Sequence, residues 1–406
     1  MMSTDHNHEA VAVTGIGMIT CQGIGRETSW NGIAAGQVSI TSWPHAIPNL
    51  PTAPRVAAGP SLPCPDDLRS SFWKSLSRVQ QLACLTVDEA LKQAELPRHL
   101  DGYSAACLVS SSVCAMDMNE NFYIQYRDDP NHASLSLLKR VHPFELPQLL
   151  IKRHRMAGPH YMNLTTCVGS AAAIGAALDI IRCGLASVAV VGGFDSLCQL
   201  LVSGFGSLRL ISPTGCRPFS PDRDGILPGE GGTALVMESI AHAKGRGAVP
   251  LGYVCGYGAT ADAFHITKPD PEAVAAERAI RLSLADAGMT LSEMDYVNCH
   301  GTGTRDNDAM ETQLYSRIFR EASPVITSTK PLTGHTFAAG GAMETAITLL
   351  AMRDGCYPPG PGRQGMHAPG NDGKGGRQIN RALICNFAFG GNNTAIVAAR
   401  SLERLS

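Results

Sequence analysis

Cys167 is the residue best placed to do covalent chemistry. It follows the run Asn163-Leu-Thr-Thr and precedes Val-Gly-Ser-Ala-Ala-Ala, which opens a predicted helix built almost entirely from small residues. A thiol at a helix N-terminus faces the positive end of the helix dipole and unpaired backbone N–H groups, and both favour the thiolate. We therefore expect Cys167 to be a nucleophile. Most of the other cysteines lie in apolar stretches and are expected to be buried structural thiols.

Two histidines could assist such a nucleophile. His300 lies in Asn298-Cys-His-Gly-Thr-Gly-Thr304, where a predicted strand ends, and His335 lies in Thr333-Gly-His-Thr336, where a predicted helix begins. Folds of the α/β class place reacting groups at such strand ends and helix starts. The helix dipole disfavours a protonated imidazole at an N-terminus, so His335 should be neutral and donate a hydrogen bond. Two neutral histidines beside a thiolate suit the stabilisation of an enolate oxygen while a thioester carries the electrophile.

Alternating strands and helices must hold these side chains. The period-2 and period-3.6 patterns predict an α/β fold with parallel or mixed sheets. The predicted strands are 11–17, 105–112, 161–166, 187–193, 233–238, 251–259, 296–299, 325–328, 382–386 and 394–399. The predicted helices are 72–93, 168–182, 271–287, 307–319 and 336–353.

The chain contains a faint internal repeat. Cys167 leads a small-residue helix that closes on Arg182-Cys-Gly184, and His335 leads another that closes on Arg353-Asp-Gly355. This echo predicts two duplicated halves, 1–245 with the nucleophile and 246–406 with the two histidines, and two such helices that approach closely at the centre. Residues 115–160 mix aromatic and charged side chains and are expected to form an insertion or cap on the first half.

Composition excludes several classes of protein. The chain has 406 residues, 44% of them hydrophobic, which is ample for a large core, and its net charge of -2 favours neither nucleic acid nor an anionic membrane as partner. No uncharged apolar run reaches the roughly 18 residues of a membrane span, and the polar N-terminus has no signal-peptide pattern. The strand 11–17 ends in glycines, but Thr20 stands where a dinucleotide fingerprint needs its third Gly, so we reject an NAD site.

Cysteine usage indicates a reducing compartment. The 13 cysteines include no C-x-x-C pair and no zinc-finger spacing. We therefore expect reduced thiols in the cytoplasm, with no disulfide framework and no metal site.

Several longer motifs resemble those of a known protein family. The chain resembles the β-ketoacyl-acyl-carrier-protein synthases of the thiolase superfamily, which are the condensing enzymes of fatty acid and type II polyketide synthesis. The resemblance covers nearly the whole chain. It is carried by Thr165-Thr-Cys-Val-Gly-Ser170, Phe219-Ser-Pro-Asp-Arg-Asp-Gly225, Gly229-Glu-Gly231, His300-Gly-Thr-Gly-Thr304, Gly334-His-Thr336 and Phe387-Ala-Phe-Gly-Gly-Asn-Asn393.

The resemblance implies a reaction and a set of roles. Cys167 would take the acyl group from an acyl-carrier thioester, with the backbone N–H groups of Cys167 and Phe389 as the oxyanion hole. His300 and His335 would stabilise the enolate formed when malonyl-carrier loses carbon dioxide, and that enolate would attack the acyl-Cys. Further implied roles are Lys330 as the electrostatic support of the site with Glu311 as its partner, Thr302 and Thr304 at the pantetheine arm, Phe389 as a gate, Val113 in the acyl pocket, and Asp308 and Glu344 as supporting carboxylates.

The resemblance also implies a fold and partners. The fold would be the thiolase fold, with duplicated βαβαβαββ halves in a five-layered α-β-α-β-α core. No cofactor would be bound, because the phosphopantetheine of acyl carrier protein brings the substrates. The chain would form a homodimer, or a heterodimer with a ketosynthase-like chain-length partner. A basic patch for the acidic carrier is expected from Lys139, Arg140, Lys152, Arg153 and Arg155.

Several residues depart from the family pattern. Ala388 replaces a Gly beside the gate, and Val168 and Ser170 stand where housekeeping enzymes often have Ala and Gly. Bulkier walls suggest a restricted acyl pocket. The spelling His-Gly-Thr-Gly-Thr with Arg305-Asp-Asn-Asp308 is closer to polyketide-type or aryl-polyene-type synthases than to the housekeeping fatty acid enzyme.

Two other functions fit the sequence less well. A thiolase would need a second reactive Cys near the C-terminus, but Cys385 lies within a strand and not in a Cys-x-Gly loop. A non-catalytic chain-length partner would lack the nucleophile, whereas this chain keeps Cys167, both histidines and Lys330. An obligate half of a catalytic heterodimer stays open.

Overall fold

The sheet strands of the chain repeat one arrangement twice. The computed structural model describes residues 9–45, 53–360 and 378–402, so the polar N-terminal run lies almost wholly outside the described residues. Outward from β1, the hydrogen-bonded order is β1-β8-β7-β5-β6, and outward from its neighbour β9 it is β9-β13-β12-β10-β11. In each half the outer three strands run parallel and the inner pairs run antiparallel. The predicted duplicated α/β fold is confirmed.

The strands of the first half are β1 (Val11–Thr20), β5 (Ala105–Ser110), β6 (His160–Asn163), β7 (Val188–Asp195) and β8 (Gly231–Glu238). Those of the second half are β9 (Gly252–Ala261), β10 (Tyr296–Asn298), β11 (Val325–Thr327), β12 (Arg381–Phe387) and β13 (Asn392–Ala399). The halves meet where Val11–Val13 of β1 pairs antiparallel with Gly252–Val254 of β9. Short strands β2 (Gly23–Ile24), β3 (Thr41–Ser42) and β4 (Arg55–Val56), which the sequence did not predict, lie in loops.

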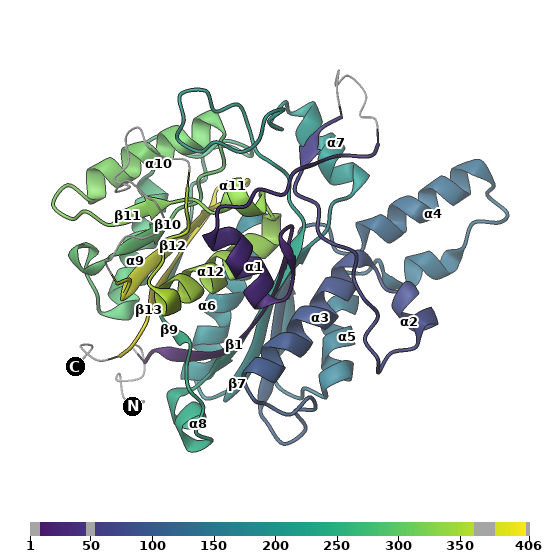
Figure 1. Ribbon diagram of the computed structural model, residues 1–406, viewed down its shortest axis with the longest axis horizontal. Coiled ribbons are helices and arrows are strands. Elements are labelled where there is room, and N and C mark those ends of the chain that lie inside the picture. The colour runs from purple at the N-terminus through teal and green to yellow at the C-terminus, as the bar shows by residue number, and fades with distance from the viewer. Residues whose placement is uncertain (1–8, 46–52, 361–377, 403–406) are drawn as a thin grey trace.

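Helices form three layers around the two half-sheets. The outer helices of the first half are α3 (Arg78–Gln93) and α5 (Glu145–His154), and those of the second half are α9 (Val274–Ala287) and α10 (Arg305–Ile318). Between the half-sheets lie α6 (Gly169–Arg182) and α12 (Gly340–Asp354), whose apolar side chains share one buried cluster with both sheets. Figure 1 shows these two helices at the centre of the molecule. The order of layers is therefore α-β-α-β-α, as expected.

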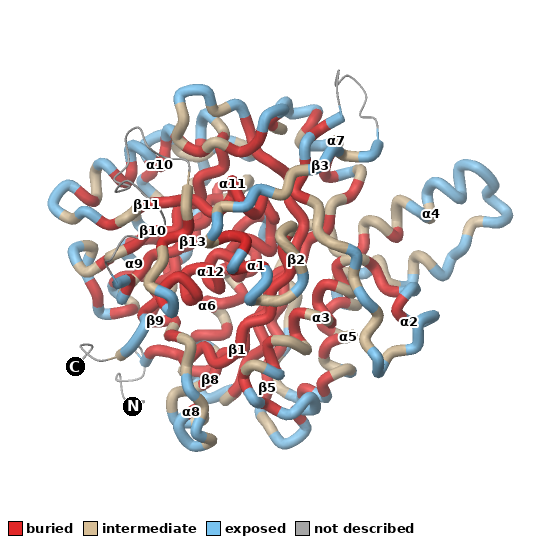
Figure 2. The backbone as a smooth tube through the Cα atoms, in the orientation of Figure 1, coloured by how far each residue is buried: buried red, intermediate tan, exposed pale blue. Residues whose placement is uncertain are grey.

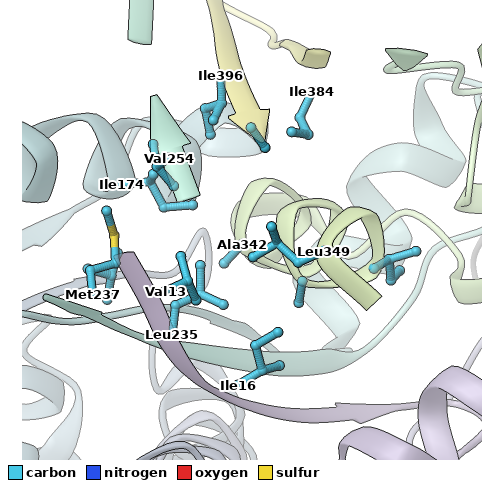
Figure 3. Packing of buried hydrophobic residues seen from close by; sticks show 14 of the residues in the cluster. Val13, Ile16, Ile174, Leu235, Met237, Val254, Ala342, Leu349, Ile384 and Ile396 are labelled. Carbon is cyan, nitrogen blue, oxygen red and sulfur yellow. The ribbon is translucent and has the colours of Figure 1, made fainter. Parts of the chain in front are cut away.

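The central cluster explains why α6 and α12 carry small residues. Ile174 on α6 and Ala342 and Leu349 on α12 pack among Val13 and Ile396, which come from strands of different halves (Figure 3). Added atoms at the contact would collide with backbone, because a Cβ on Gly341 would lie 2.6 Å from the Ala171 amide nitrogen. Two helices can share the space between the sheets only when small residues let their backbones approach.

The N-termini of α6 and α12 meet at the centre of the fold. A 3-10 turn, η3 (Thr166–Val168), leads into α6, and a second, η5 (Phe337–Ala339), leads into α12. Each turn begins with a left-handed residue, Thr166 at φ 47° and Phe337 at φ 49°. This geometry corrects the predicted repeat, because Cys167 corresponds to Ala338 and not to His335.

The region 115–160 divides into two parts. α4 (Met116–Asp128) and the 3-10 helix η2 (Leu135–Arg140) form an arm that projects from the body, and its tip is exposed (Figures 1 and 2). α5, by contrast, packs in the outer layer beside α3. The rest of the described chain adds the short helices α1 (Arg26–Ala34), α2 (Ser70–Lys74), α7 (Gln199–Ser207), α8 (Ile240–Gly245) and α11 (Lys330–Thr333), with the 3-10 helix η4 (Leu291–Glu293).

Candidate active site

Cys167 is buried and lines a cavity of about 400 Å³. Lys330 and the backbone N–H groups of Cys167 and Phe389 each act to lower the pKa of the Cys167 thiol. Burial outweighs them and raises the pKa of the thiol to about 12. The prediction that Cys167 is a thiolate in the resting protein is therefore wrong. Burying the thiolate costs more free energy than the two N–H donors and the Lys330 cation contribute.

His335 lies between α11 and η5. Its Nδ1 accepts a hydrogen bond from the Phe337 backbone N–H at 3.1 Å. The proton of a neutral imidazole must then sit on Nε2, the nitrogen that remains free to donate. Burial and the nearby Lys330 hold the pKa of His335 well below its usual range, so the ring is neutral, as predicted, although burial and not a helix dipole is the main cause.

His300 follows β10 and is organised in a similar way. Its ring lies 5.5 Å from that of His335, nearly perpendicular to it. The ammonium of Lys330 lies 3.3 Å from His300 Nδ1 and donates to the His300 carbonyl at 2.5 Å. Burial and Lys330 hold the pKa of His300 well below its usual range. With Nδ1 facing a cation, Nε2 again carries the proton and is the donor.

The carboxylate that pairs with Lys330 is Glu344. The resemblance implied Glu311 as the partner, and that expectation is wrong. Lys330 Nζ lies 2.5 Å from Glu344 Oε1, and the second oxygen of Glu344 accepts from Asn386 Nδ2 at 2.5 Å. Burial by itself would lower the pKa of Lys330, but the contact with Glu344 outweighs it and the pKa is raised. The ammonium therefore stays charged behind His300.

Glu311 and Asp308, both on α10, hold the loop that carries His300. Glu311 accepts from the backbone N–H groups of His300 and Gly301 at 2.8 and 2.6 Å, and burial raises its pKa to about 7. Asp308 accepts from the N–H of Thr302 at 3.2 Å. Both carboxylates therefore fix the backbone of the loop that carries His300. They lie one turn apart on the same face of α10.

The cavity brings the predicted residues of the reaction together. Its lining includes Cys167, His300, His335, Thr302, Thr304 and Phe389. The hydroxyls of Thr302 and Thr304 lie 2.9 Å apart on one wall. The ring of Phe389 stacks on Phe205 with centroids 5.8 Å apart. Val113 is not part of this lining and packs instead in a neighbouring apolar cluster with Phe205 and Phe337.

The predicted basic patch is only partly available. The Arg153 side chain is only 5% exposed and pairs with Asp67 and Asp88, so it is not the free surface cation that was expected. Arg155 lies 3.5 Å from Asp101, and the Arg140 guanidinium lies over the ring of Phe72. Lys139 and Lys152 are exposed.

Three further residues that support the site are not predicted by the sequence motifs. Asn386 completes the Lys330–Glu344 pair, Phe205 stacks on Phe389, and Asp195 accepts hydrogen bonds at the base of α12. Of these, only Asp195 had a visible signal, because it lies two residues after the predicted strand 187–193, and α/β folds place functional groups at strand ends. The other two depend on contacts between distant segments.

Comparisons with known proteins agree with this geometry. The sequence model described as "Beta-ketoacyl synthase, N-terminal domain" matches residues 8–243, and the one described as "Beta-ketoacyl synthase, C-terminal domain" matches residues 251–362. A 3-oxoacyl-[acyl-carrier-protein] synthase 2 of Rhizobium meliloti (strain 1021) is 30% identical over an alignment that is 431 positions long with its gaps and covers 96% of this chain and 98% of that protein. A nodulation protein E of Rhizobium sp. (strain N33) is 32% identical over 358, covering 86% of this chain and 87% of that protein.

Solved structures share the whole arrangement. The ishigamide ketosynthase/chain length factor superposes with a TM-score of 0.85 at 26% identity, covering 97% of this chain and 99% of that one. A β-ketoacyl synthase from Burkholderia phymatum STM815 has the same TM-score and identity, with 97% and 100% coverage. The two matched domain models together span most of the sequence, and the chain therefore belongs to the β-ketoacyl synthase family and has the thiolase fold.

Proposed function

We propose that this chain catalyses the decarboxylative Claisen condensation of an acyl group with a malonyl group, both carried as thioesters on acyl carrier protein. The observation that supports this most is the cavity itself. It places one thiol, two backbone N–H groups and two neutral histidines around a single space. A thioester carbonyl needs a nucleophile and an oxyanion hole, and an enolate needs neutral donors.

The first half of the reaction is acyl transfer. The Cys167 sulfur attacks the carrier thioester carbonyl, and the oxygen that becomes negative is met by the N–H groups of Cys167 and Phe389. Collapse of the tetrahedral intermediate breaks the C–S bond to pantetheine, and the leaving thiolate takes up the proton that the Cys167 thiol gave up. The acyl chain then stays on Cys167 while the carrier departs.

The second half is condensation. Malonyl thioester binds with its carbonyl oxygen between the Nε2–H donors of His300 and His335, so that the carbon–carbon bond to the carboxylate breaks with release of carbon dioxide and the electron pair forms an enolate. The enolate carbon attacks the acyl carbonyl and expels the Cys167 sulfur as a thiolate, which takes up a proton from water, leaving a β-ketoacyl chain on the carrier. In this scheme Lys330 faces Nδ1 of His300, so that the ring stays neutral and its Nε2–H remains the donor.

We infer a dimer and a reducing compartment as the setting of this reaction. The projecting arm exposes Tyr123 and Leu135, apolar surface that a partner subunit would cover. A ketosynthase solved in complex with its chain length factor from Xenorhabdus doucetiae matches with a TM-score of 0.82 at 26% identity, so a heterodimer is the second arrangement that we consider.

All 13 cysteines lie among the described residues as free thiols, which suits the cytoplasm. None of the helices in the described part of the chain has the length and apolar character needed to cross a bilayer.

A reconstituted condensation tests the proposal. The purified chain is mixed with hexanoyl- and malonyl-carrier, and the β-ketoacyl product is measured by mass spectrometry beside the His335→Ala variant. We expect product with the wild type and a loss of about 10²-fold or more in the variant, because one donor to the developing oxyanion is gone. Product that forms only after a second ketosynthase-like chain is added would support the heterodimer. No product in either arrangement would contradict the proposal.

A further inference from the structure

The N-termini of α6 and α12 are equivalent positions in the two halves of the chain, but the groups that they contact differ. Cys167 and Ala338 each follow a left-handed residue at the start of a 3-10 turn. The two turns are in contact, since a Cβ on Gly169 would lie 3.2 Å from the Cβ of Ala338. The molecule therefore holds two copies of one backbone geometry, and each copy presents an N–H group at the centre of the fold.

These two N–H groups face different partners. The Cys167 N–H faces the thiol beside the Phe389 N–H. The Ala338 N–H donates to Asp195 Oδ2 at 2.7 Å and lies 3.1 Å from Ser112 Oγ. Asp195 ends β7, and its counterpart β12 ends at Phe387, two residues before Phe389. A carboxylate therefore occupies, beside the N–H group of the second half, the place that the proposed mechanism gives to the acyl oxygen beside the N–H group of the first half.

The same carboxylate holds two loops of the site. Oδ1 of Asp195 accepts from Ser111 Oγ and the Ser112 N–H at 2.7 Å each, and from the Val113 N–H at 3.2 Å. The Ala338 turn is the one whose Phe337 N–H orients His335. Asp195 is fully buried, so four donors on two segments are fixed by one anion.

We propose that Asp195 is a positioning residue for the condensation, whose carboxylate closes the second anion site at Ala338 and fixes both the Val113 loop and the turn that orients His335. This inference rests on the role proposed for Cys167. It has an electrostatic consequence, because an anion near a thiol opposes its ionisation. The charged groups that act on Cys167 are Lys330, which lowers its pKa, and Asp195, which raises it, while His300 and His335 are neutral.

Alkylation of Cys167 by iodoacetamide tests this role without any carrier protein. The rate is followed at pH 9 by peptide mapping for the folded wild type and for Asp195→Asn, which keeps the shape and removes the charge. A lower thiol pKa raises the thiolate fraction at a given pH, so we expect Asp195→Asn to react measurably faster than the wild type. Asp195→Glu, which restores the charge, should return the rate to within about threefold of the wild type. Equal rates in the wild type and in folded Asp195→Asn would overturn the proposal.

Steady-state kinetics provide the second arm. We expect Asp195→Asn to lower kcat about tenfold or more while KM for malonyl-carrier stays within about twofold, because His335 is displaced but the surface is not. If Asp195→Asn does not fold, Ser111→Ala decides, since it keeps the charge and removes one donor. It should leave alkylation unchanged and lower kcat several-fold, and an unchanged kcat would overturn the proposal. The alkylation arm stands even if the wild-type chain makes no product, so the two proposals can fail separately.

Discussion

At the scale of single residues, buried side chains with fixed hydrogen-bond partners define the site. Nδ1 of His335 accepts from a backbone N–H, and Nδ1 of His300 faces Lys330, so both rings are left with one donor each. The sequence motifs located both histidines and the cysteine. They did not show that Glu344 and not Glu311 reaches Lys330, because both are helical carboxylates within 20 positions and only the packing of α12 against β12 selects between them.

The resting state of Cys167 can be checked directly. Burial raises its pKa to about 12, and a group whose pKa is raised stays protonated as pH increases through the ordinary thiol range. We therefore expect the rate of Cys167 alkylation in the free protein to keep rising between pH 7 and pH 10 without a plateau. Peptide-mapped iodoacetamide kinetics measure this, with the exposed Cys183 as an internal control for the activity of the reagent. A plateau for Cys167 below pH 8 would show a thiolate in the resting protein.

At the scale of elements, close contact between η3, η5 and the end of β7 holds the two halves in register. A Cβ on Gly193 would lie 2.6 Å from the Ala339 Cα and 2.7 Å from the Ala338 carbonyl oxygen. The small-residue pattern of α6 and α12 predicted such an approach. It could not give the register, because the position equivalent to Cys167 is set by the left-handed φ of Phe337, a conformation that its residue type does not signal.

Gly193→Ala tests this contact. Backbone atoms on η5 would have to move, so we expect a loss of about 1–3 kcal/mol in the free energy of unfolding. Gly245→Ala, at the end of α8 with nothing within 4 Å of the added methyl, is the matched control and should change stability by less than about 1 kcal/mol. Urea unfolding of the three proteins gives the comparison. Equal stability for Gly193→Ala and Gly245→Ala would mean that the turns are not in tight contact.

At the scale of the whole molecule, the duplicated halves share one central layer. α6 comes from the first half and α12 from the second, yet their apolar side chains belong to a single cluster with both sheets. Arg182, at the end of α6, also donates to Asp286 on α9 and to the Cys255 carbonyl. The strand–helix alternation and the family motifs predicted this architecture. The arm and the short loop strands were not predicted in detail, since their patterns are brief and mostly polar.

The shared layer predicts one cooperative unit. Cutting the chain between residues 245 and 246 would expose the apolar faces of α6 and α12, so neither fragment should fold alone. The full chain should unfold in a single calorimetric transition, and the fragment 1–245 should lack near-UV circular dichroism. Two separable transitions in the full chain, or a natively folded 1–245 fragment, would contradict this description of the core. The boundary between the halves is itself a prediction of the repeat.

The central claim is that Cys167 carries the acyl group. The most direct measurement is the intact mass of the protein after incubation with a panel of acyl-carrier thioesters, with Cys167→Ser beside it. We predict an increase equal to one acyl group on the wild type, lost in the variant, and the best-loaded chain would identify the substrate class. An adduct of equal size on Cys167→Ser, or no adduct with any thioester even when a second ketosynthase-like chain is present, would contradict it.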